Sequence, residues 1–171
     1  MASSPAPLSA TDLTRRIQAR FGQDIAEASD ALGEAVVRVS PERYHELIAT
    51  LRDDDELAFD YLDFVSAVDW GAERGFDVIA QLWSTRYRHG LRVKVAAGAE
   101  DASVPTISDL YPGADWHERE TWELFGVVFD GHPNLAKLLL PEEFEGFPLR
   151  KEFALLAREA KPWPGAKEPG E

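Results

Sequence analysis

Cysteine is absent from this chain of 171 residues. Disulfides, zinc sites built on thiolates and iron–sulfur clusters held by a protein all require cysteine sulfur. The absence therefore excludes these three kinds of site, and it suits a protein of the reducing cytosol. If the protein works in a redox system, we expect another subunit to carry the clusters.

Long apolar runs are missing too, because no stretch approaches the ~20 residues that a membrane-spanning helix needs. Residues 1–8 are an arm of mostly alanine, serine and proline without a hydrophobic signal core, and we expect this arm to be flexible. The sequence therefore favours a cytoplasmic protein, and any association with a membrane is expected to come through partner proteins.

Basic residues are scarce, since 18 lysines and arginines face 31 aspartates and glutamates, which gives a net charge of −13. This charge disfavours nonspecific binding to nucleic acid or to an anionic membrane surface. It suits either simple solubility or a basic protein partner, and the sequence leaves both open. The apolar fraction of 44%, with nine phenylalanines and five tryptophans, supplies enough side chains for one domain with a sizeable core.

Hydrophobic periodicity predicts an α+β domain over residues 9–126. Helices are expected after Ser9 and after Ser40, each a good N-cap, and again from Asp115 to Phe125. The expected fold is a small mixed or antiparallel sheet covered by helices on one face. Its strands are expected over residues 35–39, 59–68, 76–83 and 91–95, with turns at 73–75 and 89–90.

A loop-rich docking segment for a partner protein is expected over residues 127–160, followed by a flexible tail over 161–171. Three prolines within the segment exclude a long helix there. The stretch 118–153 packs charged residues, aromatics, glycines and prolines together without the periodicity of a surface helix. Such a composition, with Arg150 and Lys151 among aromatic and proline neighbours, favours protein–protein contact.

The expected third helix also carries residues that could perform chemistry. Glu120 and Glu123 lie three residues apart, and paired carboxylates serve as general acid and base in hydrolases. An ion pair between Arg119 and Glu123, one turn along the helix, explains the same residues as a structural network. No nucleophile or glycine-rich phosphate loop accompanies them, so we favour the structural interpretation.

Histidines give little further evidence of a catalytic or metal site. His117, Glu120 and Glu123 have a helical spacing, but a carboxylate-bridged metal site takes ligands from several helices. His132 is expected to anchor a loop through a hydrogen bond. His45 and His89 are expected to be ordinary surface or turn residues.

The run Glu118–Gly126, with His132-Pro133 beginning six residues after it, resembles a signature of the C subunit of the proton-pumping NADH:quinone oxidoreductase, respiratory complex I. The stretch Glu145–Phe153 resembles the second signature of this family, the 30 kDa subunit family. With similar sequence upstream, the resemblance covers roughly residues 32–153. Ala136 departs from it at a usually basic position, which puts one interfacial salt bridge in doubt.

The resemblance implies a subunit of the peripheral arm that binds no cofactor or metal and has no catalytic residues of its own. The complex as a whole uses NADH, FMN, iron–sulfur clusters and quinone. The resemblance also implies contacts with the D subunit, which holds the quinone site, and with the cluster-bearing B and I subunits. The residues that it assigns to interface and fold anchoring are Glu118, Arg119, Glu120, Trp122, Glu123, Phe125, Gly126, His132, Pro133, Lys137, Gly146, Pro148, Leu149, Arg150 and Lys151.

Two alternatives stay open beside this function. The first is the equivalent subunit of a complex I relative, such as a membrane-bound hydrogenase or a ferredoxin- or F420-dependent dehydrogenase. The second is a stand-alone hydrolase that uses the carboxylates of Glu120 and Glu123.

Overall fold

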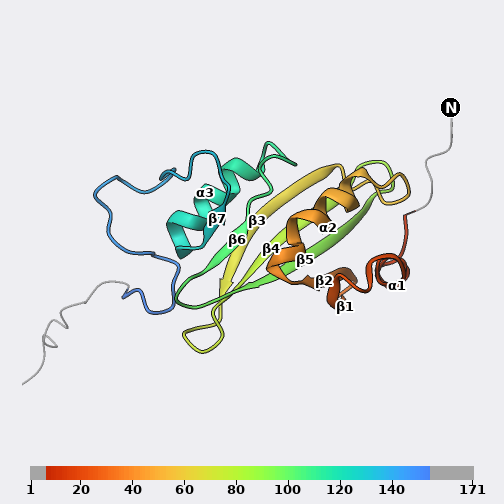
Figure 1. The fold of residues 1–171 in the computed structure, drawn as a ribbon, viewed down its shortest axis with the longest axis horizontal. Helices are drawn as coiled ribbons and strands as arrows, with labels where there is room; N and C mark the ends of the chain where they lie inside the picture. Colours follow the sequence, from red (N-terminus) through yellow and green to blue (C-terminus); the bar gives the residue numbers. More distant parts are fainter. Residues whose placement is uncertain (1–6, 155–171) are drawn as a thin grey trace, which may run out of the picture.

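Five strands form one mixed sheet in the order β1-β2-β5-β4-β3 (Figure 1). Neighbouring strands run antiparallel except β2 and β5, which run parallel. The computed structural model describes residues 7–154, so the expected tail, residues 1–6 of the expected arm and residues 155–160 of the expected docking segment lie outside the described residues. The strands are β1 (Ile25–Ala31), β2 (Glu34–Val39), β3 (Tyr61–Asp69), β4 (Phe76–Ser84) and β5 (His89–Ala97).

Three helices cover one face of this sheet, as the sequence predicts, and the α+β class is confirmed. They are α1 (Ala10–Phe21), α2 (Pro41–Asp53) and α3 (Ala114–Phe125), and a short parallel pair consists of β6 (Ser103–Pro105) and β7 (Val128–Asp130). Alternate strand residues such as Val37, Ala80 and Val93 are fully buried in one apolar core. The predicted stripe of α2 is buried in the same core and consists of Tyr44, Leu47, Ile48 and Leu51.

The predicted antiparallel meander is confirmed for β3, β4 and β5. β1 is an additional strand, which the sequence analysis missed. It pairs with β2 across a tight turn at Leu32 and Gly33, where both residues have positive φ, 56° and 82°. Figure 1 shows this hairpin near α1, at the opposite end of the molecule from the chain that follows β7.

The predicted turn at residues 89–90 is wrong, because the chain turns at 85–88 and His89 begins β5. His89 is therefore no surface residue, and only 4% of it is exposed. Its Nε2 donates a hydrogen bond to the Leu57 carbonyl at 3.1 Å. Burial lowers the pKa of His89, which keeps the imidazole neutral at neutral pH.

The face of the sheet away from the helices carries an ion pair in which Asp77 is buried and Arg38 is half-buried. Arg38 on β2 donates two hydrogen bonds to the carboxylate of Asp77 on β4, at 2.7 and 2.8 Å. The Arg38 hydrogen bonds hold the pKa of Asp77 below its usual value, against the opposing effect of burial. This pair joins two strands that are not neighbours, since β5 lies between them. We call the face of the sheet that points away from the helices the open face.

Candidate functional site

Both predicted signatures meet at one end of the molecule, on α3 and on the chain after β7. α3 ends as predicted at Gly126, which has a φ of +78° and donates its N–H to the Trp122 carbonyl at 2.8 Å. Residues 131–153, here called the docking segment, contain turns and bends but no helix or strand. The described part of the segment expected over residues 127–160 therefore contains the strand β7 and is otherwise without helix or strand, and its role in docking stays a prediction.

Glu123 is the residue of α3 that holds the docking segment most directly. Only 2% of it is exposed, and its carboxylate accepts backbone N–H groups from three consecutive residues. The donors are Leu138 at 2.9 Å, Leu139 at 2.7 Å and Leu140 at 3.2 Å. Charge-assisted hydrogen bonds of this kind are stronger than neutral ones, so Glu123 fixes the backbone of these residues against the helix.

Arg119 binds the carbonyl groups of the adjacent stretch of the docking segment. Its guanidinium donates to the carbonyls of Ala136 at 2.9 Å and Lys137 at 3.1 Å. The predicted ion pair between Arg119 and Glu123 is therefore wrong, because each side chain is taken up by backbone groups of the docking segment. Together the two side chains hold five consecutive residues, 136–140. The Arg119 guanidinium binds two of their carbonyl groups, and the Glu123 carboxylate binds three of their amide groups.

Lys137 continues the same arrangement within the docking segment itself. Its ammonium donates to the carbonyls of Pro141 at 3.2 Å, Glu142 at 2.8 Å and Phe144 at 2.7 Å. An ammonium has three N–H donors, so these contacts use all of them. The lysine therefore closes a loop over residues 137–144 and offers no free charge to a partner.

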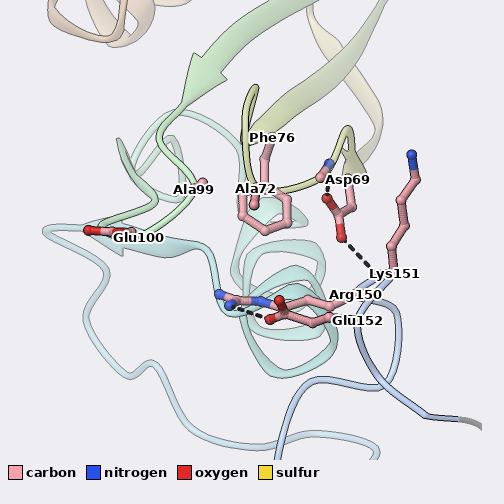
Figure 2. A pocket seen from close by; sticks show the side chains of 9 residues that line it. Asp69, Ala72, Phe76, Ala99, Glu100, Arg150, Lys151 and Glu152 are labelled. Atoms are coloured by element: carbon pink, nitrogen blue, oxygen red, sulfur yellow. Dashed lines mark hydrogen bonds and ion pairs between the residues drawn. The ribbon is translucent and has the colours of Figure 1, made fainter.

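Arg150 anchors the second signature to the end of α3 (Figure 2). Its Nε donates to the Phe125 carbonyl at 2.6 Å. Its guanidinium also lies over the rings of Phe147 and Phe76, 4.6 and 5.3 Å from their centroids. The adjacent Leu149 N–H donates to the Leu124 carbonyl at 3.0 Å. The Arg150 guanidinium thus makes these contacts within its own chain.

Lys151 behaves differently from Arg150. Its backbone N–H donates to the Asp69 carboxylate at 2.8 Å, but its ammonium has no partner among residues 7–154. Figure 2 shows the lysine side chain extending past Asp69, away from Arg150. A cavity of about 770 Å³ opens here between the β3–β4 turn, the loop after β5 and the docking segment; it is lined by Asp69, Gly71, Ala72, Phe76, Ala99, Glu100, Arg150, Lys151 and Glu152.

Glu118 and His132 form a buried polar cluster under the start of the docking segment. The Glu118 carboxyl accepts from Thr106 Oγ1 at 2.5 Å and from the Ile107 N–H at 2.8 Å. His132 Nδ1 accepts from the Asn134 N–H at 3.1 Å, so its ring proton lies on Nε2, 3.3 Å from Asp115 Oδ1. The expected role of His132 as a loop anchor agrees with this hydrogen bond. Burial, which outweighs the two hydrogen bonds, raises the pKa of Glu118 to about 7.

Glu118 is expected to make stability fall as pH rises from 4.5 to 7. Its pKa is raised from 4.5 in the unfolded chain to about 7 in the folded one, so the folded state binds more protons in this window. The stabilisation is complete below pH 4.5 and is lost above pH 7. In Glu118→Gln, Oε1 can still accept from the Ile107 N–H, and the amide nitrogen can donate to Thr106 Oγ1. The side chain cannot ionise, so the wild type should lose about 3 kcal/mol relative to this variant across the window. Urea unfolding at pH 4.5, 6 and 8 measures the difference.

The lowered pKa of His89 makes stability rise with pH, opposite to the effect of Glu118. This contribution is present in both the wild type and Glu118→Gln, so it cancels in the comparison. A difference between wild type and Glu118→Gln that stays constant from pH 4.5 to 8 would contradict proton uptake by Glu118.

Other predicted site residues lie in the same region with different degrees of exposure. Trp122 packs against the core and Phe125 meets the ring of Phe76 edge-on at 6.5 Å. Glu120 is half-buried and has no hydrogen bond or ion pair within the part of the chain that the structure describes. The remaining predicted residues, Pro133, Gly146 and Pro148, lie at turns or bends of the docking segment.

This arrangement gives no support to a hydrolase built on Glu120 and Glu123. Glu123 is buried and its two oxygens accept three amide hydrogens, so it cannot serve as a base toward a substrate. Nor do residues 7–154 contain a group of three histidine, aspartate or glutamate side chains placed to hold a metal ion.

Comparison with known proteins decides the family. A family described as "Respiratory-chain NADH dehydrogenase, 30 Kd subunit" matches residues 37–159. The chain belongs to this family. It is 42% identical over 145 residues to the NADH-quinone oxidoreductase C subunit of Roseiflexus castenholzii, covering 84% of this chain and 83% of that one. It is also 42% identical over 137 residues to the corresponding C subunit of Salinispora tropica, of which it spans 56%, against 79% of this chain.

Solved structures agree with this membership. A trypsin-resistant fragment (1–134) of Nqo5 has a TM-score of 0.62 at 28% identity, covering 72% of this chain and 98% of the fragment. A chain of an archaeal membrane-bound sulfane sulfur reductase has a TM-score of 0.73 over 86% of both chains, and at 23% identity it shows the shared fold alone. The predicted identity as a complex I subunit, and so as part of an oxidoreductase, is confirmed. Within residues 7–154 no helix is long and apolar enough to cross a membrane.

Proposed function

We propose that this subunit acts as a rigid scaffold of the peripheral arm and presents the docking segment to neighbouring subunits. The observation that carries the proposal is the direction of the signature side chains. Glu123, Arg119, Lys137 and Arg150 all bind backbone groups of their own chain. They therefore set the shape of a segment that contains no helix or strand of its own, and its outward side chains are left for a partner.

The outward side chains have the composition of an interface. Leu139 is 62% exposed, Leu149 is 51% exposed and Trp116 on α3 is 60% exposed. Glu120 on α3 and the Lys151 ammonium in the docking segment have no partner within residues 7–154. Apolar anchors among unpaired charges are typical of recognition surfaces, where burial gives affinity and charge gives specificity.

Membership of the family supports a proposal about which subunits of the complex lie next to this one. We propose contact with the D subunit, at the quinone site, and with the cluster-bearing B and I subunits. Electrons pass from NADH through FMN and iron–sulfur clusters to quinone in the other subunits, and this chain binds no cofactor. Its link to the cytoplasmic side of the membrane then runs through the complex. A role in a complex I relative predicts the same surface, and the presence of an NADH-binding flavoprotein in the purified complex distinguishes the two.

Polar substitution of the exposed leucines tests the docking segment. Leu139→Ser with Leu149→Ser should leave the free energy of unfolding of the isolated chain within about 0.5 kcal/mol, because both side chains are solvated. Recovery of NADH:quinone reductase activity with the tagged subunit, purified from membranes in mild detergent, should fall at least tenfold, as for loss of about 1.4 kcal/mol or more of binding energy.

Val128→Ser is the matched control, since Val128 is exposed and apolar but lies on β7, outside residues 131–153. Equal recovery of activity with the leucine variant and with this control would refute the docking surface. Lys151→Ala also tests the surface, because the Lys151 ammonium has no partner within residues 7–154. Arg150→Ala is less suitable, because it also removes the hydrogen bond from Arg150 to the Phe125 carbonyl.

A further inference from the structure

A second exposed apolar area lies at one end of the open face, far from the docking segment. Trp83 on β4 pairs across the sheet with Tyr61 on β3 and with Gly90 on β5. Trp83 is 42% exposed and Tyr61 is 52% exposed. The Trp83 indole lies over Gly90, since an added Cβ there would come within 3.1 Å of its ring.

The tip of the β1–β2 hairpin lies at the same end of the sheet and presents Leu32. Its side chain is fully exposed, and its backbone has a φ of +56°. Asparagine or glycine suits such a position, whereas leucine carries a conformational cost. Neither solvation nor local backbone preference favours leucine at this turn, so its presence points to a contact outside the described chain.

Between the hairpin and Trp83 lies a cavity of about 220 Å³, the end groove, lined among others by Gly33, Glu34, Gln81, Arg88, His89 and Gly90. His89 lies on the core face of the sheet, so its buried imidazole, whose Nδ1 has no hydrogen-bond partner within residues 7–154, does not face the part of the groove beside Trp83.

The charge at the mouth of the end groove is also unpaired. Arg88 is exposed in the left-handed region, with a φ of +54°, and its guanidinium has no acidic partner among the described residues. The chain as a whole carries 31 acidic and 18 basic residues, so acids are plentiful elsewhere. A solitary arginine beside an aromatic wall is a common anchor for a carboxylate of another protein.

We propose that the end groove binds a segment of a neighbouring subunit that carries an apolar side chain next to a carboxylate. The apolar side chain packs on the exposed part of Trp83, the carboxylate pairs with Arg88, and Leu32 contacts the partner from the hairpin. This inference rests on the proposed function, because the occupant belongs to the same complex. It assigns the complex a second contact with this subunit, independent of the docking segment.

Site-specific photo-crosslinking in the intact complex tests the proposal. p-Benzoylphenylalanine placed at position 32 or at position 61 should give adducts with one neighbouring subunit, at a stretch where an apolar residue adjoins aspartate or glutamate. The same probe at position 149 reports on the docking segment, and position 18, exposed on α1, is the negative control. Mass spectrometry identifies each adduct.

Arg88→Asn tests the charge, because asparagine tolerates the left-handed backbone. The variant should keep its fold and lower the adduct yield from position 61 about three- to tenfold, whereas Arg88→Lys should retain most of the yield. Arg15→Gln on α1 removes the same charge as a control. An unchanged yield with Arg88→Asn would overturn the carboxylate partner.

The outcomes separate the two proposals. Adducts from position 149 without adducts from 32 and 61 overturn the end groove alone. Adducts from 32 and 61 to a second copy of this chain overturn the neighbouring subunit as occupant. Absence of adducts from all three positions overturns the proposed function together with the groove.

Discussion

Replacement of Glu123 by alanine is expected to lower the free energy of unfolding by about 3 kcal/mol and to release the docking segment from α3. The carboxylate is buried and is the acceptor for the amides of Leu138, Leu139 and Leu140. Alanine leaves those three donors either unpaired or exposed to water after the segment has moved away. Urea unfolding measures the loss, and amide hydrogen exchange should accelerate first at residues 138–140.

Glu120→Ala is the matched control on the same helix. Glu120 carries the same charge three residues away, but has no hydrogen bond or ion pair within residues 7–154. Its removal should change the free energy of unfolding by less than about 0.5 kcal/mol and leave the exchange at 138–140 unaltered. Equal losses in the two variants would show that Glu123 acts only through the charge of the helix and does not clamp the segment.

The elements that could be predicted from sequence are those whose periodicity reflects burial. The stripe of α2 and the alternation of Leu91, Val93 and Val95 are both buried as expected. The same alternation, extended two residues towards the N-terminus, also places His89 on the core face, so a usable signal for its burial was present. β1 gave no such signal, because it is an edge strand with mixed exposure and a Leu-Gly turn in place of Asn-Gly.

The site was predictable in position but not in its contacts. Sequence spacing suggested that Arg119 pairs with Glu123, because side chains four apart on a helix can meet. In the structure Arg119 binds carbonyls 17 and 18 residues away, and Glu123 binds amides 15 to 17 residues away. A segment without regular structure has no periodicity, so its path over α3 cannot be deduced from spacing. The Arg38–Asp77 pair was missed for a similar reason, since it depends on strand order.

Replacement of Gly126 by alanine is expected to lower the free energy of unfolding by about 3 kcal/mol, for two separate reasons. The residue has a φ of +78°, where an L side chain is strained. An added Cβ would also lie 2.6 Å from an Arg150 guanidinium nitrogen and 2.8 Å from the Phe147 ring. Those side chains would have to move, and with them the hydrogen bond from Arg150 to the Phe125 carbonyl.

Gly71→Ala separates the two contributions, because Gly71 has a φ of +91° and nothing within 4 Å of an added Cβ. That variant should lose only about 1 kcal/mol, the cost of the backbone conformation. In a double-mutant cycle, Arg150→Ala should remove part of the extra loss of Gly126→Ala, since the two substitutions share a contact. Equal losses at positions 71 and 126 would mean that the second signature does not press on the end of α3. The glycine after Phe125 would then serve the helix cap alone, and the docking segment would not depend on it.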